Sequence, residues 1–318
     1  MTVFYDVFNG DADGLCALHQ LRLAEPRASV LVTGVKRDIA LLERVEAAAG
    51  DELTVLDVAL SRNVRALEKQ LARGASCRYF DHHDPGAIPS HPNFKAFIDT
   101  SPDVCTSLIV DRYLEGRQRA WAVVAAFGDN LEAAACAAAA PLELAAERLA
   151  LLRELGACLN YNAYGDSVED LNYHPADLYR TLSRYADPFD FTSDEPVFDV
   201  LKSARADDLY RASEIAPELA TERCAIYILP DAAWSRRVSG TFGNRLAAEH
   251  PERACAVLTR KADGYSVSLR TPRGAAVNAV EIARQFASGG GRHGAAGIDV
   301  LPQTELERFV SVLRAAFP

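Results

Sequence analysis

The chain lacks an excess of positive charge. Among its 318 residues, Lys and Arg total 34 and Asp and Glu total 44, which gives a formal net charge of -10. Proteins that coat long DNA or RNA neutralise many phosphates with lysine and arginine, so this balance argues against long nucleic acid as a partner. It does not exclude a small phosphorylated substrate held in a locally basic pocket.

Paired cysteines and long apolar runs are also missing. The seven cysteines are widely spaced and form no CxxC pair. This argues against a zinc ribbon or a disulfide framework and favours reduced thiols, so we expect a cytoplasmic protein. The longest apolar stretch is too short to cross a membrane, and the residues after Met1 read as a strand rather than as a signal peptide.

Hydrophobic periodicity predicts an α/β fold in the first third of the chain. Short apolar runs typical of buried strands cover Val3–Phe8, Ser29–Val35, Leu53–Val58 and Cys77–Phe80. Apolar residues at three- and four-residue spacing predict helices over Gly14–Ala24, Asp38–Ala49 and Ser61–Arg73. This alternation predicts a parallel sheet with helices on both faces.

The rest of the chain predicts a helical extension and a second α/β domain. Residues 103–186 are mostly helical in pattern, and the acidic segment 187–196, which holds two prolines, shows no sustained period. Strand and helix patterns alternate again from residue 225 onwards. We therefore predict a first domain over residues 1–190, a linker with a connecting helix over 191–222, and a smaller α/β domain over 223–318.

Acidic residues and two histidines stand where the predicted strands end. Asp11 and Asp13 follow the first strand, Asp57 follows the third, and the fourth ends in Asp81 with His82 and His83 behind it. Ligands bind outside the carboxyl ends of the strands in open parallel sheets. Crowded carboxylates repel one another unless a cation neutralises them, and oxygen ligands with imidazole suit Mn²⁺ or Mg²⁺ better than zinc. Asp129, at the end of a predicted helix, is a further candidate ligand.

Each of these residues also has an ordinary structural interpretation. Asp-Ala-Asp-Gly is often a turn or a helix N-cap, Asp57 is placed to cap the next helix, and adjacent histidines are often part of a polar loop. The convergence of several such residues on one sheet edge favours a metal site. The motif lacks the distal Glu of an EF-hand, and no HExxH pattern is present.

With these motifs the chain resembles the DHH phosphoesterase superfamily, in its branch with a C-terminal DHHA1 domain. The resemblance rests on VFNGDADG, VLDVALS, YFDHHDPG and AAFGDN, and on SGGGRHGAAG near the end, preceded by SLRT. It implies two α/β domains facing each other across a cleft, with metals in the first and substrate-binding groups in the second. RecJ-type exonucleases, nanoRNases and phosphodiesterases of dinucleotides belong to this branch.

The resemblance also implies roles for individual residues. Two Mn²⁺ ions share Asp57; one is also bound by Asp11, and the other by Asp13, His82 and Asp129. His83 contacts the scissile phosphate and Asp81 supports that corner, so the predicted catalytic residues are His83, Asp57 and Asp81. Solvent bridging two such ions becomes hydroxide near neutral pH. One or two ions are expected, with Mg²⁺ as an alternative to Mn²⁺.

The chain departs from the family pattern at two places. Relatives carry a histidine four residues before the first motif aspartate, where this chain has Val7, and Asn9 is the nearest polar substitute. In the DHHA1 motif, arginine takes the place of the histidine, which is displaced by one position. The predicted substrate-binding residues are Arg270, Gly290, Gly291, Arg292 and His293.

The leading functional prediction is a Mn²⁺-dependent phosphodiesterase that cuts short oligonucleotides, above all linear dinucleotides such as pGpG, to mononucleotides. A phosphatase acting on a small bisphosphate such as pAp is one alternative. A catalytically weakened nucleotide-binding regulatory protein is the other, because Val7 removes one expected metal ligand. We expect a short nucleotide as substrate, no long nucleic acid or membrane as partner, and possible homodimerisation.

Overall fold

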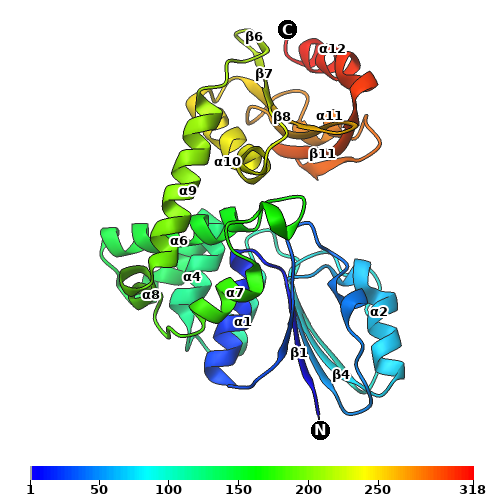
Figure 1. Ribbon diagram of the computed structural model, residues 1–318, viewed down its shortest axis with the longest axis vertical. Helices are drawn as coiled ribbons and strands as arrows, with labels where there is room; N and C mark the ends of the chain where they lie inside the picture. Colours follow the sequence, from blue (N-terminus) through cyan, green and yellow to red (C-terminus); the bar gives the residue numbers. More distant parts are fainter. Residues whose placement is uncertain (1) are drawn as a thin grey trace. The chain divides into compact units, whose positions relative to one another are not determined.

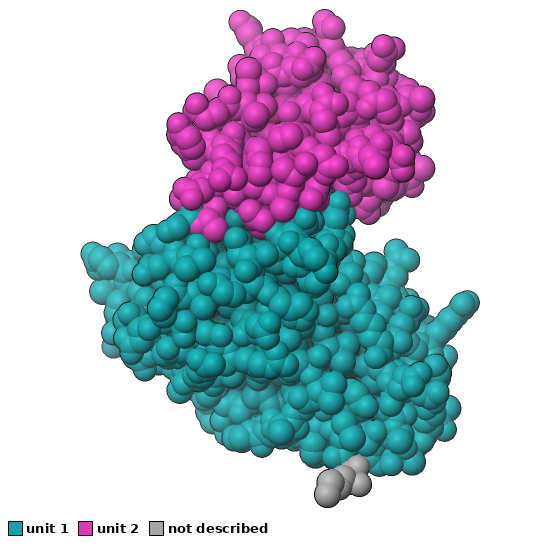
Figure 2. All heavy atoms as spheres, viewed as in Figure 1, with its two compact units in different colours: residues 1–203 teal, residues 204–318 magenta. Residues whose placement is uncertain are grey.

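The structure is a computed structural model that describes residues 2–318, apart from the side chain of Arg292. The chain divides into two compact units, Met1–Ser203 and Ala204–Pro318, shown in different colours in Figure 2. The division lies inside helix α9 (Pro196–Ser213).

Unit 1 is built on a five-stranded sheet in which all strands are parallel. The strands are β1 (Phe4–Phe8), β2 (Val30–Val32), β3 (Glu52–Leu56), β4 (Ser76–Asp81) and β5 (Phe94–Ile98), in the order β2-β1-β3-β4-β5. The chain leaves β1 towards β2 on one side and returns to β3 on the other. Ligands of open α/β sheets bind at such a reversal of strand order.

Helices cover both faces of this sheet, as predicted (Figure 1). One face packs against α1 (Ala12–Ala24) and α3 (Thr106–Tyr113), and α4 (Arg119–Gly128) and α6 (Ala146–Asn162) pack onto these helices. The other face packs against α2 (Leu60–Ala72). The helical part of unit 1 also contains α5 (Glu132–Ala139), α7 (Pro175–Leu182) and α8 (Pro188–Asp194). The largest apolar cluster joins β1 and β4 to these helices around Phe8, Phe80 and Trp121.

The helix predicted over residues 38–49 is wrong, because only a single 3₁₀ turn forms there, at Leu41–Arg44. Two polar side chains of α2 take over the backbone hydrogen bonds that a helix would have made. The amide of Asn63 donates to the Ile39 carbonyl at 2.7 Å and accepts from the Leu42 N–H. The amide of Gln70 likewise donates to a backbone carbonyl and accepts from a backbone N–H in the same loop. The apolar residues that suggested a helix are buried against α2 all the same.

Two further sequence predictions need correction. Residues 187–196 were expected to be irregular, but they form α8, whose N-cap Asp187 accepts a hydrogen bond from the Phe189 N–H at 2.8 Å. Phe191 of this helix is fully buried and meets Trp121 and Tyr185 edge-on, so packing compensates for the weak periodicity. Strand β5 was not predicted at all, because Lys95 interrupts its apolar run and none of its residues is fully buried.

Unit 2 is a mixed sheet with helices. The strands are β6 (Leu219–Ala220), β7 (Cys224–Leu229), β8 (Ala254–Lys261), β9 (Gly264–Arg270), β10 (Gly289–Arg292) and β11 (Ala295–Pro302), in the order β10-β11-β9-β8-β7-β6. Only β7 and β8 pair in parallel. The helices are α10 (Ala233–Glu249), α11 (Ala279–Ala283) and α12 (Leu306–Ala316). Among the described residues, no helix is both long and apolar enough to span a membrane.

Candidate metal centre

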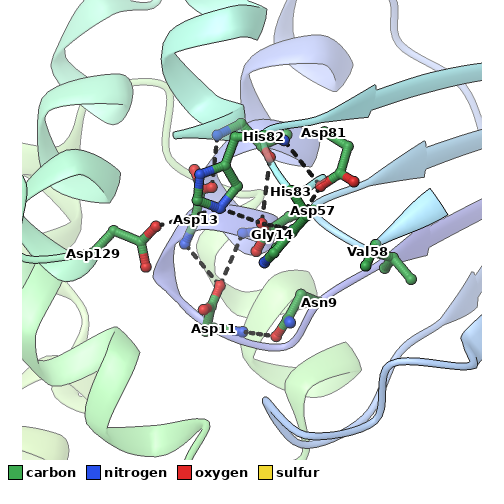
Figure 3. A network of polar contacts seen from close by, with 12 residues as sticks. Asn9, Asp11, Asp13, Gly14, Asp57, Val58, Asp81, His82, His83 and Asp129 are labelled. Carbon is green, nitrogen blue, oxygen red and sulfur yellow. Dashed lines mark hydrogen bonds and ion pairs between the residues drawn. The ribbon is translucent and has the colours of Figure 1, made fainter. Parts of the chain in front are cut away.

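The acidic residues meet at the carboxyl edge of the sheet in unit 1, where the strand order reverses (Figure 3). Asp11 and Asp13 begin α1 directly after β1, and Asp57 follows β3. His82 and His83 follow β4, and Asp129 is the C-cap of α4. Figure 3 shows Asp129 facing the cluster from the helical layer.

Asp11 is the N-cap of α1, and both of its carboxylate oxygens have protein partners. Oδ1 accepts from the backbone N–H groups of Asp13 and Gly14 at 3.0 and 3.1 Å. Oδ2 lies 2.5 Å from Nζ of Lys36. Burial alone would raise the pKa of Asp11, but the charge and hydrogen bond of Lys36 bring the pKa below its usual value. The carboxylate is therefore held ionised by a lysine.

Asp13 is held by the first residues of α3. Its two oxygens accept from the backbone N–H groups of Thr106 and Ser107, both at 2.7 Å, and Ser107 Oγ donates to the Asp13 carbonyl. A helix N-terminus stabilises a carboxylate in this way. Burial nevertheless raises the pKa of Asp13, and the nearby charges of Asp129 and Asp11 raise it further. The site thus confines negative charge that a cation would stabilise.

Asp57 is in the left-handed region of backbone conformation, with φ at 58°. Residues other than glycine rarely occupy this region, and such strain concentrates at functional sites. The side chain is 2% exposed, and Oδ1 accepts from Thr106 Oγ1 at 3.3 Å. Burial raises the pKa of Asp57 well above its usual value, and repulsion from Asp13, Asp11 and Asp129 adds to the effect. In the absence of a cation, this position is unfavourable for a charged group.

His82 points one ring nitrogen at the acidic cluster. Its Nδ1 lies 2.9 Å from the Val104 carbonyl, which can only accept, so Nδ1 carries the proton in this contact. Nε2 faces the carboxylates, 3.4 Å from Asp57 Oδ1 and 3.7 Å from Asp129 Oδ2. A backbone carbonyl commonly fixes a metal-binding histidine in this tautomer.

His83 and Asp81 form a carboxylate–imidazole pair beside His82. Asp81 is fully buried, and its Oδ1 lies 2.7 Å from Nδ1 of His83 and 2.9 Å from the His82 N–H. Burial lowers the pKa of His83, but the hydrogen bond and charge of Asp81 outweigh this and raise the pKa above its usual value. The imidazole side chain is 44% exposed. Asp81 therefore orients a histidine that solvent and substrate can reach.

Two groups of side chains present ligand atoms close enough together to hold a metal ion. The donor atoms of Asp13, His82 and Asp129 lie within 4.8 Å of one another, and so do those of Asp57, His82 and His83. Carboxylate oxygens with imidazole nitrogen are suitable ligands for Mn²⁺. The residues present therefore fit one divalent ion that uses His82. Asp11, which was also predicted as a ligand, belongs to neither group.

Lys36 was missed by the sequence analysis. It lies in the loop after β2, and its Nζ is 3.3 Å from Asp129 Oδ1 and 3.2 Å from Asn160 Oδ1, in addition to its contact with Asp11. Burial would lower the pKa of Lys36, but the negative charge of Asp11, with further contributions from Tyr164 and Asp129, raises it well above its usual value. The sequence signal that could have suggested Lys36 is its position shortly after β2, a strand that ends at this edge of the sheet.

Asn9 and Val7 do not supply the ligand that the family histidine would give. The Asn9 side chain accepts from the Asp11 N–H at 3.2 Å and donates to the Lys36 carbonyl at 3.3 Å, so it positions these two residues. Val7 is fully buried in the apolar cluster on the α2 side of the sheet.

The predicted substrate-binding residues lie on β9, on β10 and in the turn after β10, and β11 separates the two strands in the sheet of unit 2. The guanidinium of Arg270, at the end of β9, donates to Asn244 Oδ1 at 2.7 Å and to the Gly240 carbonyl at 3.4 Å, both on α10. Gly290 and Gly291 belong to β10, which pairs with β11. Gly291 has φ at 138°, and a Cβ there would meet the Ala296 Cα at 2.5 Å, so the position requires glycine.

The other two predicted residues, Arg292 and His293, follow these glycines. His293 is exposed in the turn between β10 and β11. The side chain of Arg292 lies outside the described part of the chain. Binding of substrate by these groups stays a prediction.

Comparison with known proteins agrees with the motifs. Residues 218–317 match the model of the DHHA1 domain. This match covers most of unit 2 and agrees with the DHHA1 motif of the sequence. No curated protein matches the sequence.

Solved structures share the fold over nearly the whole chain. A DHH-domain protein described as a member of the s1p family of ribosomal proteins has a TM-score of 0.62 at 14% identity, covering 99% of this chain and 86% of its own. Exonuclease RecJ bound to manganese has a TM-score of 0.58 at 17% identity, covering 99% and 90%. The pGpG-specific phosphodiesterase PggH from Vibrio cholerae has a TM-score of 0.58 at 13% identity, covering 99% of both chains.

Proposed function

We propose that this DHH/DHHA1 protein is a divalent-metal-dependent phosphodiesterase that hydrolyses short oligonucleotides, most readily linear dinucleotides such as pGpG, to mononucleotides. The observation that carries the proposal is the pair of oriented histidines at the acidic edge. His82 directs Nε2 to Asp57 and Asp129, and His83 is held by Asp81 with its imidazole accessible.

This arrangement suits phosphodiester hydrolysis. A divalent ion on the carboxylates and His82 supplies a Lewis acid that stabilises charge on a phosphoryl oxygen and lowers the pKa of bound water. His83 offers an N–H to the Asp81 carboxylate and keeps its second nitrogen for the substrate phosphate or for a proton. The raised pKa of His83 increases the share of the protonated form, which favours an anionic substrate.

The fold relatives and the charge balance support a short substrate. RecJ and PggH, both similar in fold, are described as an exonuclease and a pGpG phosphodiesterase. The net charge of -10 disfavours long nucleic acid. We therefore expect the rate to fall as the substrate lengthens from two to about ten nucleotides.

Product analysis with Mn²⁺ tests the proposal. The purified protein is incubated with pGpG, pAp, a cyclic dinucleotide and a short RNA, and the products are separated chromatographically. Mononucleotide release from pGpG supports the proposal, release of free phosphate from pAp instead indicates a phosphatase, and binding without turnover indicates a regulatory protein. Full activity in excess chelator, or in Asp57→Ala, would exclude the metal-dependent mechanism.

Substitution of His83 tests whether this site carries out the hydrolysis. His83→Ala is expected to lower kcat by about 10²–10⁴-fold, the usual contribution of a positioned acid or base. His250→Ala is the matched control, because His250 is exposed at the C-cap of α10 in unit 2. Equal rates in the two variants would remove His83 from the mechanism.

A further inference from the structure

We propose that the metal centre holds one divalent ion and that the ammonium group of Lys36 takes the place of a second. This inference deepens the proposed function, and it rests on the metal centre described above. It departs from the two-ion arrangement that the superfamily resemblance implies. The observations that carry it are the partners of Asp11, the environment of Lys36 and the residue at position 7.

The ammonium of Lys36 occupies the free side of Asp11. Oδ1 of Asp11 already accepts from two backbone N–H groups at the start of α1, and Oδ2 is 2.5 Å from Nζ. A metal ion binds a carboxylate oxygen at a shorter distance, about 2.0–2.1 Å for Mg²⁺. An ion on Oδ2 would therefore lie close to the ammonium in its present position, and the two positive charges would repel each other.

Lys36 is fixed in place rather than reaching in from a flexible loop. Its backbone N–H donates to the Ala163 carbonyl at 2.9 Å, and its own carbonyl accepts from Asn9 Nδ2. Its ammonium has three oxygen partners, on Asp11, Asp129 and Asn160, which matches the three protons it can donate. The ammonium also lies 5.7 Å from the centre of the Tyr164 ring, within the range of a cation–π contact.

The other expected ligand of this ion is absent as well. Val7 occupies the position of the family histidine and is fully buried among apolar side chains. Asn9 uses its amide to hold Asp11 and Lys36. By contrast, the donor atoms of Asp13, His82 and Asp129 lie within 4.8 Å of one another. The second group of closely spaced donor atoms, from Asp57, His82 and His83, shares His82 with the first, so the chain keeps ligands for one ion and replaces the other ion with a covalently attached charge.

Counting bound Mn²⁺ tests this inference without reference to turnover. Metal-free protein is titrated with Mn²⁺ by calorimetry, and the saturated sample is measured by electron paramagnetic resonance. We expect the wild-type chain to bind one ion with the spectrum of an isolated Mn²⁺. Lys36→Gln removes the positive charge beside Asp11 and is expected to bind two ions with a spin-coupled spectrum.

Three variants control the interpretation. Lys36→Arg keeps the charge and is expected to stay at one ion. Asp11→Asn combined with Lys36→Gln also removes the carboxylate that had lost its lysine partner and is expected to return the number of ions from two to one. Lys36→Met keeps the aliphatic chain beside Tyr164 and replaces Lys36→Gln if that variant does not fold.

The outcomes separate this inference from the proposed function. Two ions in the wild-type chain, or one ion in both uncharged Lys36 variants, would overturn the replacement of an ion by lysine. One ion in the wild-type chain without hydrolysis of any nucleotide would leave the replacement intact and contradict the proposed function. No bound Mn²⁺ in the wild-type chain would contradict both.

Discussion

Asp57 carries two unfavourable features at one position. Its backbone is left-handed, with φ at 58°, and its carboxylate is buried close to other carboxylates. Strain and like-charge crowding both reduce the stability of the metal-free chain, and both make sense where a cation is to be bound. Asparagine tolerates left-handed backbone better than most residues and has no charge.

Asp57→Asn is therefore expected to stabilise the metal-free protein and to weaken Mn²⁺ binding. The gain in the free energy of unfolding should be about 1–2 kcal/mol in excess chelator, because one buried repulsive charge is removed and the Thr106 contact can be kept. Denaturant unfolding with and without Mn²⁺ measures both effects. A variant that is less stable than the wild type in chelator would show that crowding at Asp57 is already compensated.

Individual site residues differ in how far the sequence could reveal them. Asp11, Asp13 and Asp57 follow strands directly, so their placement at one edge can be predicted from strand order alone. Lys36 contacts Asp129 and Asn160, which are far away along the chain, and no local pattern encodes that approach. Asn9 was recognised as a possible ligand, but its amide is used to hold the Lys36 loop.

At the scale of elements, amphipathic spacing predicted α2 well and failed over residues 38–49. Both segments bury apolar side chains, so their periodicity looks alike. What distinguishes them is the pair of amides from Asn63 and Gln70, which satisfy backbone groups of the loop from outside. Such competition between side-chain and helical hydrogen bonds depends on tertiary contacts and cannot be read locally.

Helix α1 contains a titratable group that links the stability of unit 1 to pH. His19 is 1% exposed, contacts Trp121 of α4 edge-on and lies with Nε2 2.8 Å from the Tyr185 carbonyl. Burial lowers the pKa of His19 from 6.5 to about 4, and the hydrogen bond to Tyr185 only partly offsets this. The unfolded chain therefore binds a proton at a higher pH than the folded chain does.

Stability should accordingly fall as the pH drops from about 6.5 towards about 4. Between about pH 7 and about pH 5, His19 accounts for a loss of about 2 kcal/mol in the free energy of unfolding. Denaturant unfolding at the two pH values should show a smaller loss in His19→Gln than in the wild type. His250→Gln, at an exposed site, should behave as the wild type. Equal losses in His19→Gln and the wild type would mean that His19 is not the group responsible.

At the scale of the whole molecule, the order of motifs was more informative than any single element. The parallel sheet and the placement of acids at its carboxyl edge followed from strand–helix alternation, and the structure shows both. The glycine-rich segment gives no strand pattern in the sequence, because glycine is disfavoured in strands. It forms β10, where Gly291 lies too close to Ala296 for a side chain.

Unit 2 is predicted to contribute to substrate binding through the arginine of its glycine-rich segment. Arg292→Ala should raise KM by an amount equivalent to about 1–3 kcal/mol, the cost of a lost charge-assisted contact, and leave the Mn²⁺ content unchanged. Arg314→Ala on α12 is the control, because Arg314 is exposed in the same unit. Kinetics and metal analysis of both variants check this, and an unchanged KM in Arg292→Ala would exclude the contact.

Arg270→Ala needs a stability measurement beside the kinetics. Its guanidinium joins β9 to α10 through Asn244 and Gly240, so its loss is expected to destabilise unit 2 whatever its role in binding. An increase in KM without a change in unfolding would assign Arg270 to the substrate rather than to the fold.

Each unit has its own apolar core, because two of the four apolar clusters lie in unit 1 and the other two lie in unit 2. A unit with its own core melts as its own all-or-none transition, so differential scanning calorimetry should record two heat-absorption peaks. Mn²⁺ stabilises only the folded state that binds it, and it should move the peak of unit 1 upwards and leave that of unit 2 in place. The calorimeter would thereby report which half of the protein a given ligand binds, without any enzymatic assay.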